Sequence, residues 1–326
     1  MSASTSTSAP GEITLETIRS AVSRTAALRR RTPLLQLDAG LWVKPENLQL
    51  TGSFKVRGAL AALTALSPEQ LGRGVVTHSS GNHGQGIACA ASLLGSSATV
   101  VIPEGAPEVK VRRAAAWGAR IVRCGASAKE REDAALREAQ LHGLTLIPPF
   151  DHPDVIAGQG SAGLEIFEDL PDAANVLVPV GGGGLLAGVA TALKSLNPAI
   201  RVFGVEPELA ADAAESFRSG QLTGWSAELT NRTIADGVRT QQLGELNFEL
   251  IRSSVAGFLT VSEEAILGAA AWYLLEAKLV AEPTGAVTLA AYRELRDAAD
   301  SPLAAGPTVV VLSGGNADPA FLAGLS

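Results

Sequence analysis

Short runs of β-branched residues alternate along this chain with longer alanine-rich segments of helical period, and this alternation limits the possible folds more than any other feature. The runs expected to form buried strands are 74–78, 97–102, 119–122, 174–180, 200–206 and 308–312. The segments expected to be helical are 53–65, 83–94, 107–117, 127–142, 184–196, 263–278 and 285–298. Because parallel strands need crossover helices, the pattern predicts an α/β fold with doubly wound, open α/β/α sheets.

The 326 residues suffice for two domains of ordinary size. The run PPFDHPD at 148–154 is the expected hinge, because clustered prolines and aspartates end regular structure. We predict a small domain over 74–151 and a large domain that combines 1–73 with 152–326.

Composition excludes several classes of partner. A net charge of −7 argues against a nucleic-acid or anionic-membrane surface. No apolar run reaches the roughly 18 residues of a membrane-spanning helix, and the first ten residues lack the apolar core of a signal peptide. Cys89 and Cys124 lack CxxC spacing, which favours reduced thiols in the cytoplasm. A cytoplasmic protein with a small-molecule ligand is therefore expected.

Four consecutive glycines, 181–184, follow a predicted strand and open a predicted helix. Their backbone N–H groups can converge on an anion at the helix N-terminus, where the helix dipole adds to the attraction. An ordinary turn is the alternative, but it would not need four residues that each cost backbone entropy. The run therefore indicates a phosphate site, although no lysine follows it as in a Walker loop.

HSSGNHGQG at 78–86 also stands where a strand gives way to a helix, and LSGGN at 312–316 follows the last strand. Open α/β sheets bind ligands at the carboxyl ends of their strands. Helix capping by Ser80 or Asn82 would account for part of the first loop but not for His83. We therefore expect a ligand loop at 78–86, while Ser313 either caps a helix or reaches a ligand.

Lys55 is one of six lysines and stands in TGSFKVRGA between Phe54 and Val56. An apolar setting lowers the pKa of an ammonium group, and the free amine is a nucleophile for carbonyl compounds, including pyridoxal phosphate. The phosphate site predicted at 181–184 is consistent with that cofactor. The alternative is a solvated lysine in the first turn of the helix at 53–65.

Taken together, TGSFKVRGA, SSGNHGQG, IAGQG, VPVGGGGLLAG, TIADGV and LSGGN, in this order, resemble the fold type II pyridoxal-phosphate enzymes of the tryptophan synthase β-like family. Within it, the chain is most similar to the serine/threonine dehydratase and serine racemase group, from about residue 15 onward. The resemblance implies two domains with the cofactor in the cleft between them, the large one binding it and the small one closing on substrate. It also implies a homodimer.

The resemblance implies a role for each matching residue. The implied cofactor contacts are Phe54, Lys55, Asn82, Gly181, Gly182, Gly183, Gly184 and Ser313. The implied substrate contacts are Ser79, Ser80, Asn82, His83 and Arg131. Lys55 would link covalently to the cofactor and take the Cα proton of the substrate, Asn82 would bond the 3′ oxygen of the ring, and Ser313 would face the pyridine nitrogen.

The implied activity is a dehydratase that converts a small hydroxy amino acid into a 2-oxo acid and ammonia. Ser313 favours elimination, because a neutral hydroxyl leaves the pyridine ring a weaker electron sink than a carboxylate would. Ser80 points to the alternative, a serine or hydroxyaspartate racemase or a 3-hydroxyaspartate dehydratase, because it could act as a second catalytic base. A non-catalytic binding protein is a third possibility, which the retained Lys55 disfavours.

The run VEPELAAD at 205–212 resembles the acidic cluster that binds Mg²⁺ or Mn²⁺ in the racemases. Glu206 and Asp212 would supply carboxylates and Ala210 its carbonyl oxygen, the hard ligands that such cations prefer. Solvated surface charge is the alternative.

Overall fold

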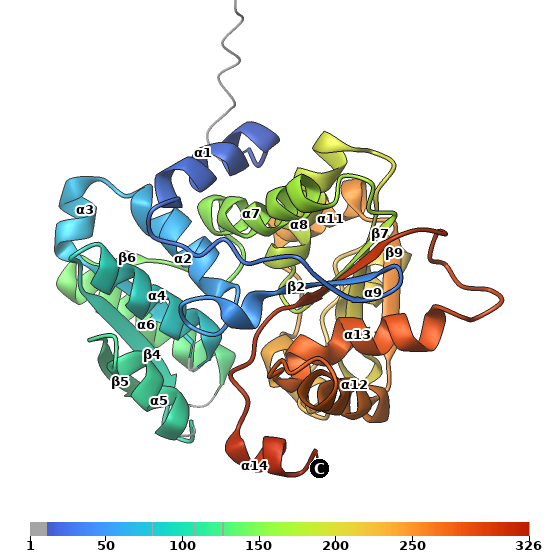
Figure 1. Cartoon of the computed structure of the whole chain (residues 1–326). Coiled ribbons are helices and arrows are strands. Elements are labelled where there is room, and N and C mark those ends of the chain that lie inside the picture. Colours follow the sequence, from blue (N-terminus) through green and yellow to red (C-terminus); the bar gives the residue numbers. More distant parts are fainter. Residues whose placement is uncertain (1–11, 80, 107, 126, 326) are drawn as a thin grey trace, which may run out of the picture.

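The computed structural model describes residues 12–79, 81–106, 108–125 and 127–325, which form two β-sheets with helices around them (Figure 1). The six-stranded sheet has the order β1-β2-β10-β7-β8-β9, and the four-stranded sheet has the order β5-β4-β3-β6. Within the described ranges, every pairing between these strands is parallel except that of β1 with β2. The predicted α/β class with parallel sheets is confirmed.

The six-stranded sheet contains three predicted strands and three that the sequence did not reveal. Its strands are β1 (Leu35–Asp38), β2 (Leu41–Pro45), β7 (Asn175–Pro179), β8 (Arg201–Pro207), β9 (Gly257–Val261) and β10 (Thr308–Leu312). β2 was not predicted because Lys44 interrupts its apolar pattern. Lys44 is nevertheless buried, and it forms an ion pair with Glu165. β1 and β9 are edge strands with partly exposed faces, and such strands lack a continuous apolar run.

The four-stranded sheet contains β3 (Val75–His78), β4 (Ala98–Pro103), β5 (Arg120–Cys124) and the two-residue β6 (Thr145–Leu146). Its helices are α3 (Pro68–Arg73), α4 (Asn82–Leu93), α5 (Glu108–Ala115) and α6 (Ala128–His142). The strands and helices predicted between 74 and 142 are therefore confirmed within a few residues at each end.

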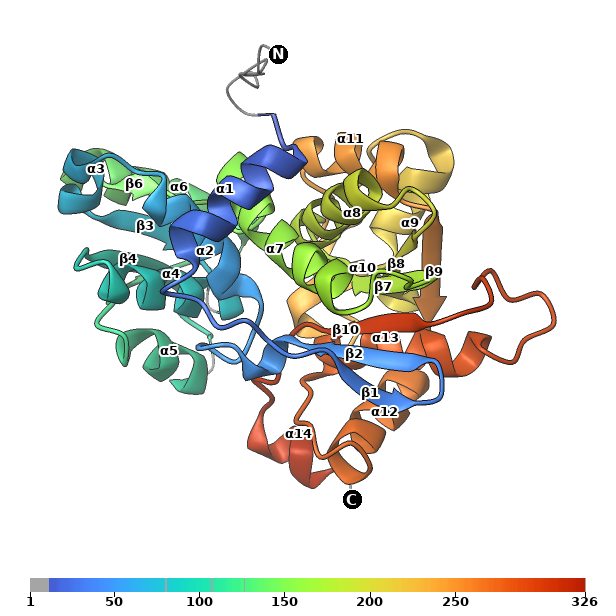
Figure 2. The same cartoon turned by 45° about the horizontal axis from the view of Figure 1, so that its top comes forward.

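Apolar side chains of alternate residues enter two cores on opposite faces of the six-stranded sheet. Val309 and Val311 of β10 pack with α1 (Leu15–Thr25), α7 (Pro153–Asp169), α8 (Gly184–Leu196) and α11 (Glu245–Ser254). Val310 and Leu312 pack with α12 (Glu263–Leu275) and α13 (Pro283–Leu295) on the other face. Figure 2 shows this sheet between the two groups of helices.

Helix α2 (Lys55–Thr64) packs against α4 of the four-stranded unit and against α7. A side chain at Gly158 of α7 would lie 2.6 Å from the Ala61 Cβ and from the Arg57 carbonyl oxygen, so only glycine permits this crossing. The glycines of IAGQG therefore serve helix packing. They also hid α7 from prediction, because glycine disfavours helix.

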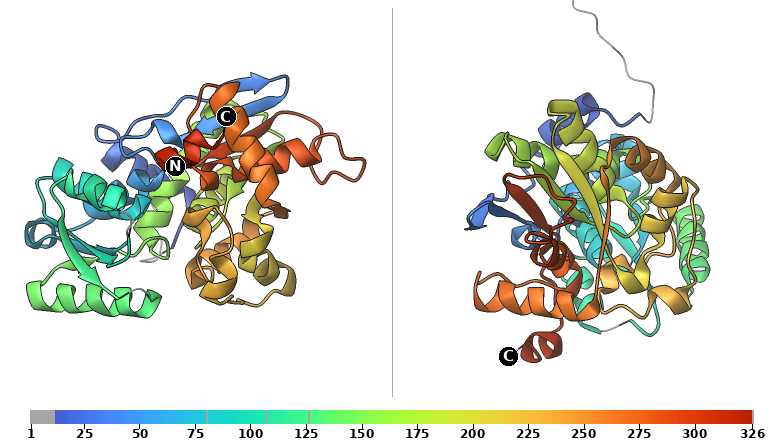
Figure 3. Two further views of the ribbon diagram at one scale, coloured as in Figure 1. Left: turned by 90° about the horizontal axis from the view of Figure 1, so that it is seen from below. Right: turned by 90° about the vertical axis from the view of Figure 1, so that its right-hand side faces the viewer.

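The shorter elements are η1 (Glu46–Leu48), η2 (Glu208–Ala210), α9 (Asp212–Ser219), α10 (Ala227–Thr230), η3 (Asp236–Val238) and α14 (Pro319–Ala323). The view from below in Figure 3 shows the elements of 75–146 grouped beside those of the six-stranded sheet. The run 148–154 joins β6 to α7, and the predicted domain boundaries and hinge remain predictions. None of the described helices is long and apolar enough to cross a membrane.

Candidate active site

The start of α2 is attached to the residues that directly follow β10. The backbone N–H of Phe54 donates to the carbonyl oxygen of Ser313 at 3.0 Å, and Ser53 forms a β-bridge with Gly314. These contacts place Lys55, the first residue of α2, beside Ser313 although 258 positions separate them in the sequence. The structure thus brings together the two motifs TGSFKVRGA and LSGGN.

Lys55 is partly buried at the start of α2. Its Nζ donates to the carbonyl oxygen of Pro149 at 2.9 Å and lies 5.1 Å from the centroid of the Phe54 ring. No carboxylate in the described ranges forms an ion pair with it. Burial lowers the pKa of the Lys55 amine to about 8. A substantial fraction of free amine is therefore present near neutral pH, which argues against the alternative of a solvated surface lysine.

Ser313 fits a ligand with a hydrogen-bonding ring atom. Its side chain is 2% exposed, and its Oγ has no hydrogen-bond partner among the described residues. The buried Oγ of Ser53 beside it is also unpaired in this part of the chain. Unpaired buried hydroxyls are costly, and a ring nitrogen such as that of pyridoxal phosphate would satisfy one of them.

Asn82, the first residue of α4, forms hydrogen bonds with two residues from the part of the chain around the six-stranded sheet. Its Nδ2 donates to Glu282 Oε1 at 2.7 Å, and its Oδ1 accepts from Asn316 Nδ2 at 2.7 Å. Burial, followed by the charge of Asp236, raises the pKa of the Glu282 carboxyl to about 7. Asn82 therefore lies near Ser313, as the motifs implied.

The glycine run forms a helix N-terminus suited to a phosphate. Gly183 has φ +92° and precedes α8, whose first turn has no side-chain cap. A side chain at Gly182 would collide with the ring of Phe150. Thr240 Oγ1 lies 2.7 Å from where a Gly181 Cβ would be, and it is buried without a partner among the described residues. Free N–H groups and this hydroxyl together fit a phosphate.

The other predicted site residues of the loop at 78–86 are Ser79, Ser80 and His83. Ser79 Oγ accepts a hydrogen bond from the N–H of Gly81 at 3.3 Å, and Ser80 lies outside the described residues. His83 is 2% exposed with its Nε2 3.3 Å from the Ile147 carbonyl oxygen. Burial, and then the charge of Lys55, lower the pKa of His83 to about 3, so this imidazole is neutral.

Arg131 of α6 donates to the carbonyl oxygen of Ser127 in its own helix at 3.4 Å. Burial lowers the pKa of His78, which begins the loop at 78–86, and the charge of Arg131 also lowers it. The closing role of Arg131 remains a prediction, as do the substrate roles of Ser79, Ser80 and His83.

The predicted metal ligands are buried. Glu206 and Asp212 are 1% and 2% exposed, which contradicts the alternative of solvated surface charge. Glu206 accepts from the backbone N–H of Ala214 at 2.7 Å, while Asp212 Oδ2 has no partner in the described part of the chain. Burial and Asp212 raise the pKa of Glu206 well above its usual value, and burial raises that of Asp212 to about 7. Two adjacent buried carboxylates fit a cation.

Ala210 ends η2 between these two carboxylates. Within the described ranges, no three or more His, Cys, Asp or Glu side chains group in a way that could hold a metal ion. A site here would therefore need backbone carbonyl oxygen or water in addition to Glu206 and Asp212.

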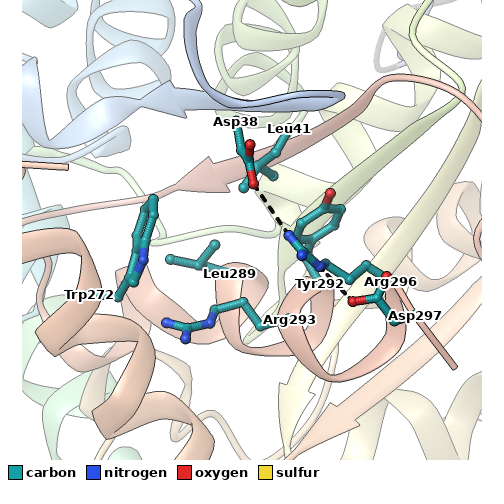
Figure 4. A pocket seen from close by; sticks show the side chains of 8 residues that line it. All are labelled: Asp38, Leu41, Trp272, Leu289, Tyr292, Arg293, Arg296 and Asp297. Carbon is teal, nitrogen blue, oxygen red and sulfur yellow. Dashed lines mark hydrogen bonds and ion pairs between the residues drawn. The ribbon is translucent and has the colours of Figure 1, made fainter. Parts of the chain in front are cut away.

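A separate cavity of about 410 Å³ lies at the other end of β10. Figure 4 shows its lining residues, which are Asp38, Leu41, Trp272, Leu289, Tyr292, Arg293, Arg296 and Asp297. Leu41 pairs with Thr308 at the start of β10, whereas Ser313 follows its end. This cavity is therefore distinct from the candidate site around Lys55.

Sequence reasoning missed three contributors to the site, namely Glu282, Asn316 and Thr240. An acidic residue directly before Pro283 marks a helix start, and this signal could have identified Glu282. Asn316 ends the quoted LSGGN motif, whose last residue was given no role. Thr240 follows η3 in a loop without any local signal.

Comparisons with known proteins agree with this geometry. The profile of the family described as "Pyridoxal-phosphate dependent enzyme" matches residues 25–314. L-threo-3-hydroxyaspartate ammonia-lyase of Saccharomyces cerevisiae is 42% identical over 301 residues, covering 92% of this chain and 90% of the relative. Serine racemase of Schizosaccharomyces pombe is 39% identical over 312 residues and covers 94% of each chain. The crystal structure of the T.th. threonine deaminase has a TM-score of 0.87 and 46% identity, covering 94% of this chain and 99% of that one.

Proposed function

This chain belongs to the family of pyridoxal-phosphate-dependent enzymes, and from that membership we propose that it is an ammonia-lyase of small 3-hydroxy amino acids such as L-threonine or L-serine. The products are a 2-oxo acid and ammonia. The observation that carries the proposal is that the segment of Lys55, whose amine has a lowered pKa, is hydrogen-bonded to Ser313, whose hydroxyl has no partner among the described residues. Two of the similar proteins are named as an ammonia-lyase and a deaminase.

The residues present fit pyridoxal phosphate. Gly181 to Gly184 and Thr240 would hold its phosphate, Phe54 and Ser313 its ring, and Lys55 its reactive carbon. When bound, this cofactor supplies a carbonyl that captures the substrate amine and a conjugated ring that accepts electrons from Cα.

Lys55 supplies the proton transfer. Because its pKa is about 8, its neutral amine can take the proton from the substrate Cα near neutral pH. Loss of the β-hydroxyl as water, followed by gain of water and release of ammonia, gives a 2-oxo acid with no net change of oxidation state. Ser313 offers no charge to the ring, which favours departure of the hydroxyl over return of the proton.

A substrate assay tests the proposal. We expect 2-oxo acid from L-serine, L-threonine or L-threo-3-hydroxyaspartate, and a loss of at least about a thousandfold in kcat/KM for Lys55→Ala. Lys129→Ala is the matched control, because this lysine is 84% exposed. Turnover that survives in Lys55→Ala, or purified protein that shows no cofactor absorbance, would contradict the proposed chemistry.

A second candidate function is racemisation of serine or hydroxyaspartate at the same site. The similarity to serine racemase of Schizosaccharomyces pombe supports it, and Ser80 is the proposed second base. Chiral analysis of recovered substrate should show the opposite enantiomer, and Ser80→Ala should abolish its formation while elimination from one enantiomer continues. Recovered substrate of a single configuration would exclude this activity.

We also propose that Glu206, Asp212 and the carbonyl of Ala210 bind Mg²⁺ or Mn²⁺. The support is the burial of both carboxylates and the unpaired Asp212 Oδ2. We expect either cation to raise the thermal unfolding midpoint of chelator-treated protein, and expect Asp212→Asn to remove this response. An equal response in Asp212→Asn would contradict the site.

A homodimer is our proposal for the assembly. Helix α12 exposes Leu267 at 41% and Leu275 at 50%, an apolar surface that a second copy could cover. Light scattering should give twice the chain mass, and Leu267→Glu should shift it towards the monomer. The unpaired Cys89 and Cys124 support a cytoplasmic location, which fractionation of cells can test.

The division into 74–151 and the remaining chain is likewise a proposal. Lys110 of α5 forms an ion pair with Asp236 of η3, and Arg113 donates to the Asn316 carbonyl oxygen at 3.2 Å. Both contacts join elements of the two sheets and would have to break on opening. Substrate should therefore slow hydrogen exchange in α5, whereas unchanged exchange there would argue against closure.

A further inference from the structure

Glu282 is buried beside the candidate site, yet the chemistry described so far gives it no role. It is 6% exposed and immediately precedes Pro283, the first residue of α13. Its side chain does not cap that helix. Instead, its Oε1 accepts from Asn82 Nδ2 at 2.7 Å, and its backbone N–H donates to the Gly314 carbonyl oxygen at 3.1 Å. The carboxyl group is thus directed across to α4.

The hydrogen bonds determine which way the Asn82 amide faces. Asn316 Nδ2 lies 2.7 Å from the Thr51 carbonyl oxygen, which can only accept, so this atom of Asn316 is the nitrogen. The same nitrogen lies 2.7 Å from Asn82, which must therefore present its Oδ1 to it. The Asn82 nitrogen then faces Glu282 and uses one of its two hydrogens there. Its second hydrogen remains for another acceptor.

The charges around Glu282 come from two elements, η3 and α5. Asp236 of η3 opposes its ionisation, while Lys110 and Arg113 of α5 favour it more weakly. Lys110 is itself paired with Asp236, and no cation in the described ranges forms an ion pair with Glu282. Burial is the largest influence, and the pKa of Glu282 lies at about 7.

We propose that Glu282 is a positioning residue that, with Asn316, holds the Asn82 amide so that one N–H is free to donate to the ring oxygen of the cofactor. The inference rests on the proposed function, because it assumes that pyridoxal phosphate is the ligand. Glu282 acts through Asn82 and touches no substrate atom. Asn82 lies on α4, whereas Glu282 directly precedes α13 and Asn316 follows β10. The orientation therefore exists only when the elements of 75–146 contact those around the six-stranded sheet.

Titration of cofactor-free protein with pyridoxal phosphate, followed by absorbance, tests the proposal. Glu282→Leu removes the acceptor, so we expect affinity to fall by roughly tenfold, the effect of losing one hydrogen bond that orients the Asn82 amide. Glu282→Gln keeps an acceptor oxygen, and we expect its affinity within about threefold of the wild type at pH 6. Glu294→Leu, on the exposed side of the same helix, is the matched control and should bind like the wild type.

The pH dependence separates positioning from a merely structural role. Ionisation of Glu282 adds a negative charge near the anionic cofactor, so the ratio of wild-type affinity to Glu282→Gln affinity should fall as pH rises through about 7. Deprotonation of Lys55 affects both proteins alike and leaves this ratio unchanged. Glu282→Gln carries the test even if Glu282→Leu does not fold.

Three results would overturn the proposal: wild-type affinity in Glu282→Leu, equal losses in Glu282→Leu and Glu282→Gln, or a wild-type pH profile in Glu282→Gln. Wild-type protein that fails to bind pyridoxal phosphate would instead refute the proposed function.

Discussion

The ion-paired side chains around Arg57 and the candidate site around Lys55 both include residues of α2. They differ in how completely their polar side-chain atoms are paired. We define the ion cluster as Arg29, Lys44, Glu46, Arg57 and Glu165. Arg57 is 0% exposed, with its Nε 2.7 Å from Glu46 and its Nη2 2.7 Å from Glu165. Lys55, two residues earlier, has no such partner in the described chain and donates only to a carbonyl oxygen.

The contrast shows what pairing does to a buried charge. Burial raises the pKa of Glu165, but hydrogen bonds and charges from Arg57 and Lys44 outweigh it and hold that pKa at about 2. Glu165 therefore remains ionised near neutral pH, although burial lowers the pKa of Lys44 in the same cluster. Lys55 has burial without compensation, so its pKa falls to about 8 and its amine remains reactive. Lys55, which has no ion pair in the described chain, thus lies in one candidate site with two buried hydroxyls that lack a partner there, those of Ser313 and Thr240.

Removing the centre of the ion cluster should have the largest effect. Arg57→Met leaves Glu46 and Glu165 buried without their main partner, and we expect a loss of about 3–5 kcal/mol in the free energy of unfolding, measured with urea. Arg24→Met is the control, because the Arg24–Asp154 pair is 32% and 36% exposed and should contribute about 1 kcal/mol or less. Equal losses in both variants would refute the distinction.

Acid should reduce the stabilisation that Glu165 contributes to the ion cluster. Glu165 has a folded-state pKa of about 2 against 4.5 when unfolded, so its stabilisation is fully present above pH 4.5 and is lost as pH falls towards 2. The shift corresponds to about 3 kcal/mol. We expect the urea midpoint to fall over this window in the wild type, and expect a shallower fall in Glu165→Gln. Parallel profiles would contradict the assignment.

The two buried lysines should differ in reactivity. In cofactor-free protein at pH 8, the lowered pKa leaves more of the Lys55 amine neutral, so an acylating reagent should modify Lys55 faster than the exposed Lys129, by roughly tenfold. Lys44 is 0% exposed and paired with Glu165, so it should stay unmodified. Mass spectrometry of timed samples measures each rate. Modification of Lys44 as fast as Lys55 would remove the contrast.

The smallest effect is expected for two buried serines. Ser313→Ala removes an unpaired hydroxyl, so stability should change by less than about 1 kcal/mol while cofactor affinity falls by roughly fivefold. Ser161 accepts from Arg57 at 2.9 Å, and Ser161→Ala should cost about 1–3 kcal/mol without changing affinity. Reversal of this pattern would show that pairing does not separate the two groups.

Local pattern predicted much of this molecule. The strands β3, β4, β5, β7, β8 and β10 are apolar runs that turn signals delimit, and Lys55, Asn82 and the glycine run lie in recognisable motifs. The remainder depends on distant partners. Lys44 can be buried because it pairs with Glu165, which is 121 residues away in the sequence. Glu282 is part of the site only through its hydrogen bond with Asn82, which is 200 residues away. No local window contains such information.

The position of β10 has a consequence for synthesis. It is the last strand of the described chain, yet it lies inside its sheet between β2 and β7. While the ribosome is still making the chain, the β1–β2 hairpin therefore lacks β10, its neighbour in the sheet, and Lys55 has no Ser313 beside it. N-terminal parts of a protein usually begin to fold first, but this site cannot form until residues 308–316 have emerged. The chain can therefore bind the cofactor at this site only after residues 308–316 have been translated.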